Sequence, residues 1–183
     1  MSVFKHWMIL IAMLMPWSGA AAEEAIFAGG CFWRMEKLFE QVPGVSTVVS
    51  GYSGGKSTNP TYKTYGSGGH IEVVKVTFDP GQVSYDQLLD VFWQRIDPTD
   101  SKGQSVDRGH KYTSAIFYLN ESQHKTATAS KKRLDESAVF DAPIVTPVRP
   151  ASPFYAAEEY HQDYYKKNVL RYWYYQTRSG RDD

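Results

Sequence analysis

The chain has 183 residues, with 20 basic and 20 acidic side chains and a hydrophobic content of 42%. This length fits one domain, and this hydrophobic content is sufficient for a core and excludes a disordered chain. No cluster of Lys and Arg indicates a nucleic-acid surface, so no nucleic-acid partner is expected.

The first 22 residues have the pattern of a secretory signal peptide. Lys5 precedes an apolar run over 7–15, and the small residues at 20–22 provide a cleavage site before Glu23. The apolar run is too short to act as a membrane anchor. The sequence therefore predicts a signal peptide at 1–22, a mature domain at 23–183, and a periplasmic or secreted location without a membrane anchor.

The only cysteine, Cys31, follows a short apolar segment at 25–28 and two glycines. Apolar residues then recur at helical spacing from Phe32 to Val42, which predicts a strand, a glycine turn and a helix that begins at the cysteine. The free N–H groups and the dipole of such a helix end favour a thiolate. An inert buried cysteine is the alternative. A lone thiol in an exported protein has no partner within the chain, however, and is a liability unless its chemistry is used.

Two strands are expected next, over 45–52 and 70–79, and the spacing between them allows antiparallel pairing. Alternation in the second strand places Glu72 on the apolar face that carries Val74 and Val76. A carboxyl group on that face would be desolvated, which raises its pKa and keeps it protonated. A frayed strand end, with Glu72 in water, is an equally open alternative.

The rest of the chain mixes helical and strand patterns. The expected elements are a helix over 84–96 opened by a capping box, a strand over 113–119, a helix over 120–137, an edge strand over 144–148, and a helix from 152 that carries Tyr155, Tyr160, His161 and Tyr164. The tail from residue 168 is aromatic and basic without a clear period. This order predicts an α+β fold, a two-layer sandwich with a mixed sheet covered by helices.

The residues alone leave the function open. Metal binding is not indicated, because the sequence has neither a His-x-x-x-His nor a Cys-x-x-Cys pair. One possibility is a cysteine hydrolase, in which His110 or His161 is the base for Cys31. Another is an exported binding module that grips a ligand with its aromatic side chains, which form 15% of the chain, while Cys31 stays inert.

A set of motifs resembles those of the A-type peptide methionine sulfoxide reductases. They occur in family-like order and spacing between about 25 and 182, and include residues 30–33, 51–55, 59–62, 69–73, 112–116 and 154–164. The resemblance implies a ferredoxin-like plait. It also implies an enzyme that reduces the S epimer of methionine sulfoxide, free or in proteins.

The same resemblance implies roles for individual residues. Cys31 attacks the sulfoxide sulfur and becomes a sulfenic acid, while Glu72 protonates the sulfoxide oxygen. Tyr52 and Tyr112 hold that oxygen by hydrogen bonds. The substrate pocket contains Phe32, Trp33, Asp107 and Tyr164, of which the first two cradle the S-methyl group.

Two features depart from the family pattern. Many members carry a second, resolving cysteine in the C-terminal tail, and this chain has none. An external thiol, either a thioredoxin-like protein or a small thiol, is therefore expected to reduce the sulfenic acid, which requires a pocket open to it. No bound cofactor is implied, and a monomer is the default expectation. His110 and Lys111 stand where the family often has Thr-Gln.

Overall fold

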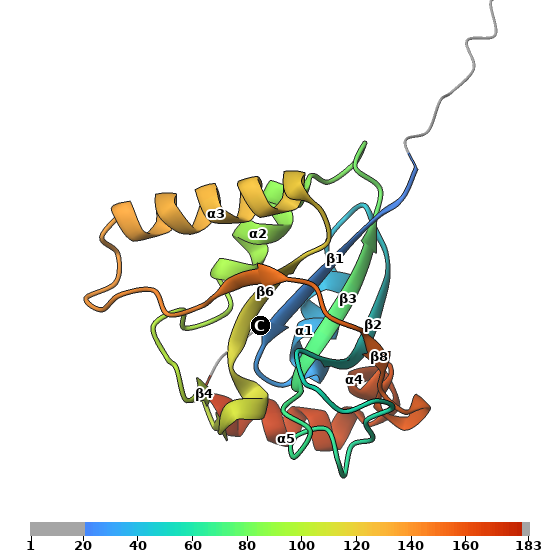
Figure 1. The fold of residues 1–183 in the computed structure, drawn as a ribbon. Helices are drawn as coiled ribbons and strands as arrows, with labels where there is room; N and C mark the ends of the chain where they lie inside the picture. Colours follow the sequence, from blue (N-terminus) through green and yellow to red (C-terminus); the bar gives the residue numbers. More distant parts are fainter. Residues whose placement is uncertain (1–20, 181–183) are drawn as a thin grey trace, which may run out of the picture.

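A computed structural model describes residues 21–180. Its main sheet has six strands in the order β7-β6-β1-β3-β2-β8 (Figure 1). Their bounds are β1 (Glu23–Gly29), β2 (Val45–Ser53), β3 (Ile71–Phe78), β6 (Ser114–Tyr118), β7 (Val148–Pro150) and β8 (Tyr155–Ala156). The neighbouring strands are antiparallel, except that β6 and β7 are parallel. Residues 1–20 of the predicted signal peptide lie outside the described residues.

The central strands and two helices follow the order βαββαβ along the chain. Helix α1 (Phe32–Glu40) joins β1 to β2, and α2 (Tyr85–Trp93) stands between β3 and β6. The four strands lie in the order β6-β1-β3-β2, which is the arrangement of a ferredoxin-like plait. The predicted α+β class and the antiparallel pairing of β2 with β3 are thus confirmed.

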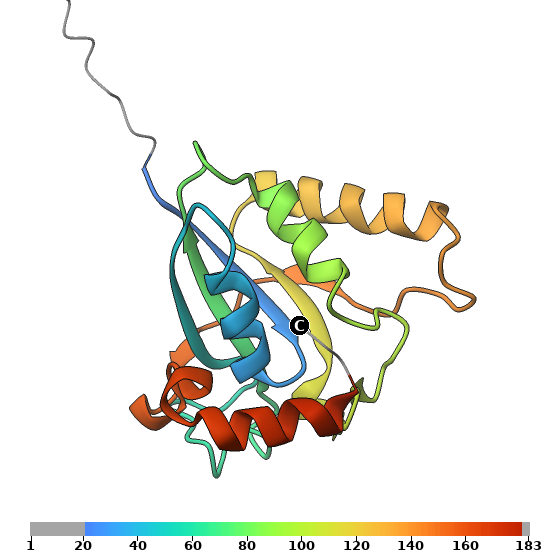
Figure 2. The ribbon, with the colours of Figure 1, turned by 180° about the vertical axis from the view of Figure 1, so that it is seen from behind.

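The helices cover one face of the sheet, as the view from behind shows (Figure 2). Phe27 of β1 stacks on Phe39 of α1 at 4.9 Å and on Phe92 of α2 at 5.3 Å, so one buried ring joins both helices to the sheet. Replacing such a ring by Ala typically costs about 3–5 kcal/mol of stability. Helix α3 (Glu121–Glu136) packs against α2 and the strands at that side of the sheet.

The predicted capping box at the start of α2 is confirmed. The Ser84 hydroxyl accepts a hydrogen bond from the Gln87 amide, and the Gln87 side chain accepts one from the Ser84 amide at 2.8 Å. Two N–H groups that α2 cannot satisfy internally are therefore bonded.

The opposite face of the sheet is covered by extended chain. The segment that links β7 to β8 crosses β1 and β3 (Figure 1). Its side chains Ala151 and Phe154 pack on a second apolar cluster, formed by Ile26, Ala28, Ile71, Val73, Ala115 and Phe117. The sheet is therefore buried on both faces, although helices cover only one.

The C-terminal part of the chain differs most from the sequence-based expectation. The edge strand runs from Val148 to Pro150 rather than over 144–148, although it does lie at the edge. The helix expected from residue 152 is wrong. The segment instead forms β8, a 3-10 helix η2 (Glu159–His161) and a short α4 (Tyr164–Lys167).

The edge of β2 explains why no helix forms from residue 152. Ala156 pairs with Gly51 in the sheet. The Gln162 side chain then accepts a hydrogen bond from the Ser50 amide at 2.9 Å and donates one to the Ser50 carbonyl at 3.0 Å. The backbone N–H and C=O groups at the edge of β2 need hydrogen-bond partners. Pairing with them outweighs the tendency of the segment to form a helix.

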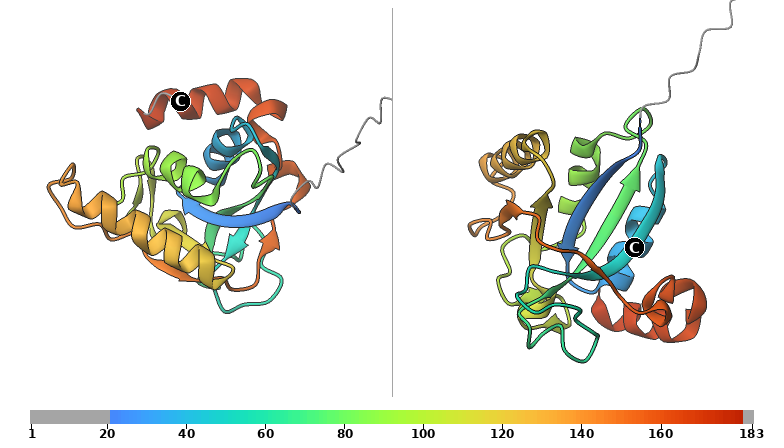
Figure 3. Two further views of the ribbon diagram at one scale, coloured as in Figure 1. Left: turned by 90° about the horizontal axis from the view of Figure 1, so that it is seen from above. Right: turned by 45° about the vertical axis from the view of Figure 1, so that its right-hand side comes forward.

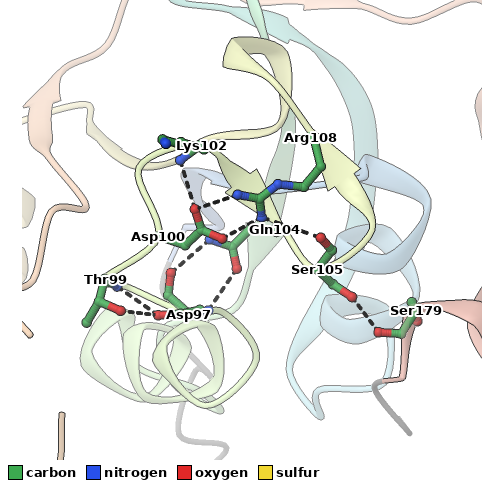
Figure 4. Close-up of polar contacts among 8 residues, drawn as sticks. All are labelled: Asp97, Thr99, Asp100, Lys102, Gln104, Ser105, Arg108 and Ser179. Carbon is green, nitrogen blue, oxygen red and sulfur yellow. Dashed lines mark hydrogen bonds and ion pairs between the residues drawn. The ribbon is translucent and has the colours of Figure 1, made fainter. Parts of the chain in front are cut away.

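A final helix, α5 (Val169–Ser179), was not predicted. It lies beside α1, near the end of the sheet where β1 stops (Figure 3). Lys37 of α1 lies 5.3 Å from the centre of the Tyr172 ring of α5. The far end of α5 is tied to a small hairpin of β4 (Gly103–Gln104) and β5 (Asp107–Arg108), because the Ser105 hydroxyl donates to the Ser179 carbonyl (Figure 4).

The hairpin itself is held by side chains from the preceding loop (Figure 4). Gln104 accepts a hydrogen bond from the Asp97 amide and donates one to the Asp97 carbonyl, each at 2.8 Å. Arg108 forms an ion pair with Asp100. These contacts fix β5, which carries Asp107. Within residues 21–180, no helix has both the length and the apolar character needed to cross a membrane.

Candidate active site

Cys31 is the N-cap of α1, in the turn after β1, as the sequence predicted. Gly30 has φ of +90°, and a Cβ there would lie 2.7 Å from the Cβ of Gln104, so only glycine fits this close approach. The thiol is free, and the residue is 6% exposed. Little of Cys31 is therefore exposed to solvent, less than expected for a thiol that an external reductant must reach.

Glu72 lies beside the start of α1 and is 2% exposed. Of the two alternatives left open by the sequence, the structure therefore shows the buried carboxyl group and not a frayed strand end. One carboxyl oxygen accepts a hydrogen bond from the Tyr65 hydroxyl at 2.6 Å, and the other accepts one from the Phe32 amide at 2.9 Å. Burial raises the pKa of Glu72 to about 7 although both hydrogen bonds lower it. A large share of this group is protonated at neutral pH, so it can act as a general acid.

The prediction that the helix end keeps Cys31 ionised is wrong, because the surrounding side chains favour the neutral thiol. Burial raises the pKa of the Cys31 thiol well above its ordinary value, and the charges of Glu72 and Asp107 raise it further. Hydrogen bonds from the Tyr175 hydroxyl and the Trp33 amide lower this pKa by less. Forming the nucleophile therefore needs a group that takes the thiol proton.

The tyrosines divide into two groups. Burial raises the pKa of Tyr112, and the nearby charges of Glu72 and Cys31 raise it further. The same causes, burial first, raise the pKa of Tyr62 to about 12. Tyr52 differs, because its hydroxyl donates to Glu158 at 2.8 Å while its ring stacks on Tyr65.

This placement does not support the oxygen-holding role expected of Tyr52. Its hydroxyl is held by Glu158, and Tyr62 stands in the electrostatic reach of Cys31 that the role requires. Sequence reasoning missed Tyr62 because a loop tyrosine carries no periodic signal. The motif at 59–62 was the signal that could have found it.

Aromatic side chains form a wall beside Cys31, and Phe32, Trp33 and Tyr164 meet there as predicted. The Trp33 and Tyr164 rings stack with centres 3.7 Å apart and planes at 8°. Trp33 also donates from Nε1 to Nδ1 of His161 at 3.2 Å. Phe32 also packs against His161, at 5.2 Å between ring centres. These rings form a continuous aromatic cluster at the start of α1.

Neither histidine considered as a hydrolase base is placed for that role. His161 accepts a hydrogen bond at Nδ1 from Trp33, and burial lowers its pKa, so it is neutral with its proton on Nε2. His110 is exposed, and its Nε2 lies 3.2 Å from the Gly69 carbonyl oxygen. Among the hydrogen bonds of residues 21–180, none joins either ring to Cys31.

Strand β5 and helix α5 contribute Asp107 and Tyr175 to the site. Tyr175 of α5 donates a hydrogen bond from its hydroxyl to Asp107, and this hydroxyl also faces the Cys31 thiol within hydrogen-bonding reach. Burial raises the pKa of Asp107, while Tyr175 and the nearby Arg34 lower it. Asp107 thus lies within electrostatic reach of Cys31. Tyr175 was missed because its helix was missed.

A second carboxyl group, Glu36, holds the aromatic wall in place. It is 1% exposed, and it accepts a hydrogen bond from the Asp163 amide at 3.0 Å. Together with Glu40 and Asp163 it forms a group of carboxylates with spacing that could hold a metal ion. Lys166 forms ion pairs with Glu40 at 2.6 Å and Asp163 at 2.7 Å, so a cationic side chain already compensates this group.

A single cysteine at a helix end, a buried protonatable carboxyl group beside it and an apolar wall define a cysteine-dependent enzyme on a ferredoxin-like plait. Comparison with known proteins gives the family. Residues 23–183 match the family model described as peptide methionine sulfoxide reductase. The chain is 55% identical over 161 residues to the peptide methionine sulfoxide reductase MsrA of Bacillus subtilis (strain 168), covering 87% of this chain and 91% of that protein.

Solved structures agree with this result. Methionine sulfoxide reductase A of Corynebacterium diphtheriae has a TM-score of 0.77 and 34% sequence identity, covering 81% of this chain and 76% of that chain. Mxr1 from Saccharomyces cerevisiae in reduced form has a TM-score of 0.75 and 28% identity, covering 88% and 93%. The chain belongs to the peptide methionine sulfoxide reductase A family, and it is an oxidoreductase that reduces methionine sulfoxide.

Proposed function

We propose that this enzyme reduces the S epimer of methionine sulfoxide, free or in proteins, through a sulfenic acid on Cys31 that an external thiol resolves. The observation that carries the proposal is the buried Glu72. Its carboxyl group bonds the first amide of the helix that Cys31 caps, and its pKa of about 7 keeps much of it protonated.

In the chemical step, Cys31 attacks the sulfoxide sulfur while Glu72 donates its proton to the sulfoxide oxygen. Protonation is necessary because an oxygen with a full negative charge is a poor leaving group in a buried site. Tyr62 and Tyr112 supply hydroxyl donors to the same oxygen. The resulting hydroxyl group then passes from the substrate sulfur to the Cys31 sulfur as the bond between the two sulfurs breaks, which leaves methionine and a sulfenic acid on Cys31.

Selectivity for one epimer follows from three fixed directions around the sulfur. The oxygen points to Glu72, the methyl group packs on the wall formed by Trp33 and Tyr164, and the rest of the substrate points outward. If the rest of the methionine side chain keeps its outward direction, the opposite epimer places its oxygen against the aromatic wall and its methyl group toward Glu72. The apolar wall would then desolvate the oxygen without a hydrogen bond, which is unfavourable.

Recycling is intermolecular in this proposal, because Cys31 is the only cysteine. A small thiol or a thioredoxin-like protein attacks the sulfenic acid, forms a mixed disulfide and is then displaced by a second thiol. Mxr1 from Saccharomyces cerevisiae, which shares the fold, has been solved in complex with Trx2, which supports a protein reductant. No bound cofactor takes part.

The location is proposed from the N-terminal sequence. The pattern of residues 1–22 supports a signal peptide and export to the periplasm or the medium without an anchor. The family match begins at residue 23, and β1 begins at Glu23, which supports a domain boundary there.

The test offers the purified enzyme each epimer of a methionine sulfoxide peptide with dithiothreitol as reductant. We expect reduction of the S epimer only, and none by a Cys31→Ser variant, which retains the shape of the site without the thiol. Reduction of the R epimer at a similar rate, or retained activity in the serine variant, would contradict the proposal.

A further inference from the structure

The Tyr175 hydroxyl stands between an acid and the nucleophile. It donates a hydrogen bond to Asp107, and it faces the Cys31 thiol within hydrogen-bonding reach. A hydroxyl that donates its proton to a carboxylate still has lone pairs with which to accept one. The thiol proton can therefore point at the tyrosine oxygen, which makes a continuous chain from Cys31 through Tyr175 to Asp107.

We propose that Tyr175 and Asp107 together take the proton of the Cys31 thiol when Cys31 attacks the sulfoxide. The thiol proton moves to the Tyr175 oxygen as the tyrosine proton moves to the Asp107 carboxylate. Tyr175 ends neutral, Asp107 ends protonated, and the sulfur carries the electron pair that forms the bond to the sulfoxide sulfur. This inference rests on the proposed function, in which Glu72 delivers a different proton to the sulfoxide oxygen, so the complex of enzyme and substrate neither gains nor loses a proton in the step.

The site needs such an acceptor because the thiol is held in its neutral form. Cys31 is buried, and the carboxylates of Glu72 and Asp107 face it from β3 and β5, so its own pKa is raised. The hydroxyls of Tyr62, Tyr112 and Tyr175 also lie within electrostatic reach of the thiol. Loss of the thiol proton to water is therefore unfavourable at neutral pH.

The other candidate bases are committed elsewhere. Glu72 must be protonated to act as the acid, so it cannot also accept the thiol proton. His161 uses Nδ1 to accept from Trp33, and His110 lies on the exposed surface against Gly69. Asp107 is half-buried, where burial favours its protonated form, and it touches the thiol only through Tyr175.

Helix α5 is built to hold this hydroxyl in place. Its inward side carries the buried Tyr172, and its end is tied to the β4–β5 hairpin by the contact between Ser105 and Ser179. Tyr174, the residue before Tyr175, is 57% exposed, and its hydroxyl accepts a hydrogen bond from Arg178 at 3.1 Å. Tyr174 thus provides a matched control on the same helix.

The experiment uses the full enzyme and its Tyr175→Phe, Asp107→Asn and Tyr174→Phe variants. Methionine formed in a single turnover is measured at saturating S-sulfoxide without added thiol, as a function of pH. In parallel, the rate of Cys31 alkylation by iodoacetamide against pH gives the midpoint of thiol ionisation without any sulfoxide present.

We expect Tyr175→Phe to slow methionine formation by about 10²-fold at pH 7, the scale of a lost general base, with a smaller loss as pH rises. Its alkylation midpoint moves to higher pH, because the thiolate loses a hydrogen-bond donor. Asp107→Asn also slows methionine formation, although removal of a negative charge moves its alkylation midpoint to lower pH. Tyr174→Phe behaves as the wild type in both measurements.

Two results would overturn the proposal. One is a Tyr175→Phe variant that forms methionine at the wild-type rate and is alkylated faster at every pH, which would mean that the ring only shields the thiol. The other is an Asp107→Asn variant that forms methionine faster, which would mean that the carboxylate only raises the pKa of the thiol. If the wild type formed no methionine, the proposed function would fail instead, and the alkylation midpoints would still test the contact between Tyr175 and Cys31.

Discussion

Glu72 and Glu36 are two buried glutamates in similar surroundings that have different tasks. Glu72 is 2% and Glu36 1% exposed, each accepts a hydrogen bond from a backbone amide, and burial raises the pKa of each to about 7. Glu72 bonds the start of the helix that Cys31 caps, whereas Glu36, one turn into the same helix, bonds the Asp163 amide.

The difference between them is position relative to the nucleophile. A raised pKa alone marks a buried acid, and it marks a catalytic acid only where a reacting atom lies next to it. Glu72 has Cys31 beside it, while Glu36 has the segment that carries His161 and Tyr164. We therefore assign proton transfer to Glu72 and support of the aromatic wall to Glu36.

The largest expected difference is in the chemical step. Replacement of Glu72 by Gln keeps a hydrogen-bonding side chain but removes the proton donor, so methionine formation in a single turnover should fall by about 10²-fold or more. Glu36→Gln can still accept from the Asp163 amide and should change the same rate by less than about 10-fold, as expected of a group that transfers no proton. Equal losses in the two variants would contradict the division of tasks.

The pH profile sharpens the same comparison. Above pH 7 the protonated share of Glu72 falls, because burial sets its pKa at about 7, so the wild-type sulfoxide step should slow as pH rises from 6 to 9. Glu36→Gln should keep this profile, since its titration does not enter the step. A wild-type rate that stays constant over this range would show that another group supplies the proton.

The aromatic wall should give the next largest effect. Trp33→Ala removes the stack on Tyr164 and the hydrogen bond to His161. We expect kcat/KM for a methionine sulfoxide peptide to fall by an amount equivalent to about 1–3 kcal/mol, the scale of a pocket contact with a methyl group. Steady-state rates on peptide and on dimethyl sulfoxide, which lacks the rest of the side chain, check this. An unchanged kcat/KM on both would exclude the methyl-binding role.

The smallest expected effect is on stability. Burial raises the pKa of Glu36 above its unfolded value of 4.5, so its contribution is fully present below pH 4.5 and is lost as pH rises through about 7. Glu36→Gln has no such loss. Its Tm relative to the wild type should therefore increase between pH 5 and pH 8, as thermal unfolding at a series of pH values would show. A Tm difference independent of pH would mean that Glu36 is ionised throughout.

The part of the site built on local pattern could be predicted from the sequence. The glycine turn before Cys31 and the helical spacing after it define the end of β1 and the start of α1, and alternation places Glu72 on the buried face of β3. Both features depend on neighbours in the sequence. Phe32 and Trp33 follow from the same helix.

The C-terminal part of the site depends on distant partners and could not be predicted in the same way. Residues 155–163 follow the edge of β2, where Gln162 bonds Ser50 across 112 positions of sequence. α5 exposes Leu170 and Trp173 while it buries Tyr172, so its apolar residues do not mark the side that packs on the fold, and Tyr175 gains its role only through its contact with Asp107. The position of Tyr52 against Glu158 is likewise a long-range contact.

The central claim is that Cys31 alone receives the sulfoxide oxygen, with no second thiol in the chain to resolve it. The most direct measurement mixes the reduced enzyme with excess S-sulfoxide without added thiol, and records the methionine formed and the intact mass. We predict about one methionine per chain, from one thiol oxidised one step. We also predict a sulfenic acid that dimedone traps at Cys31. Several methionines per chain in the absence of any added thiol would contradict the account.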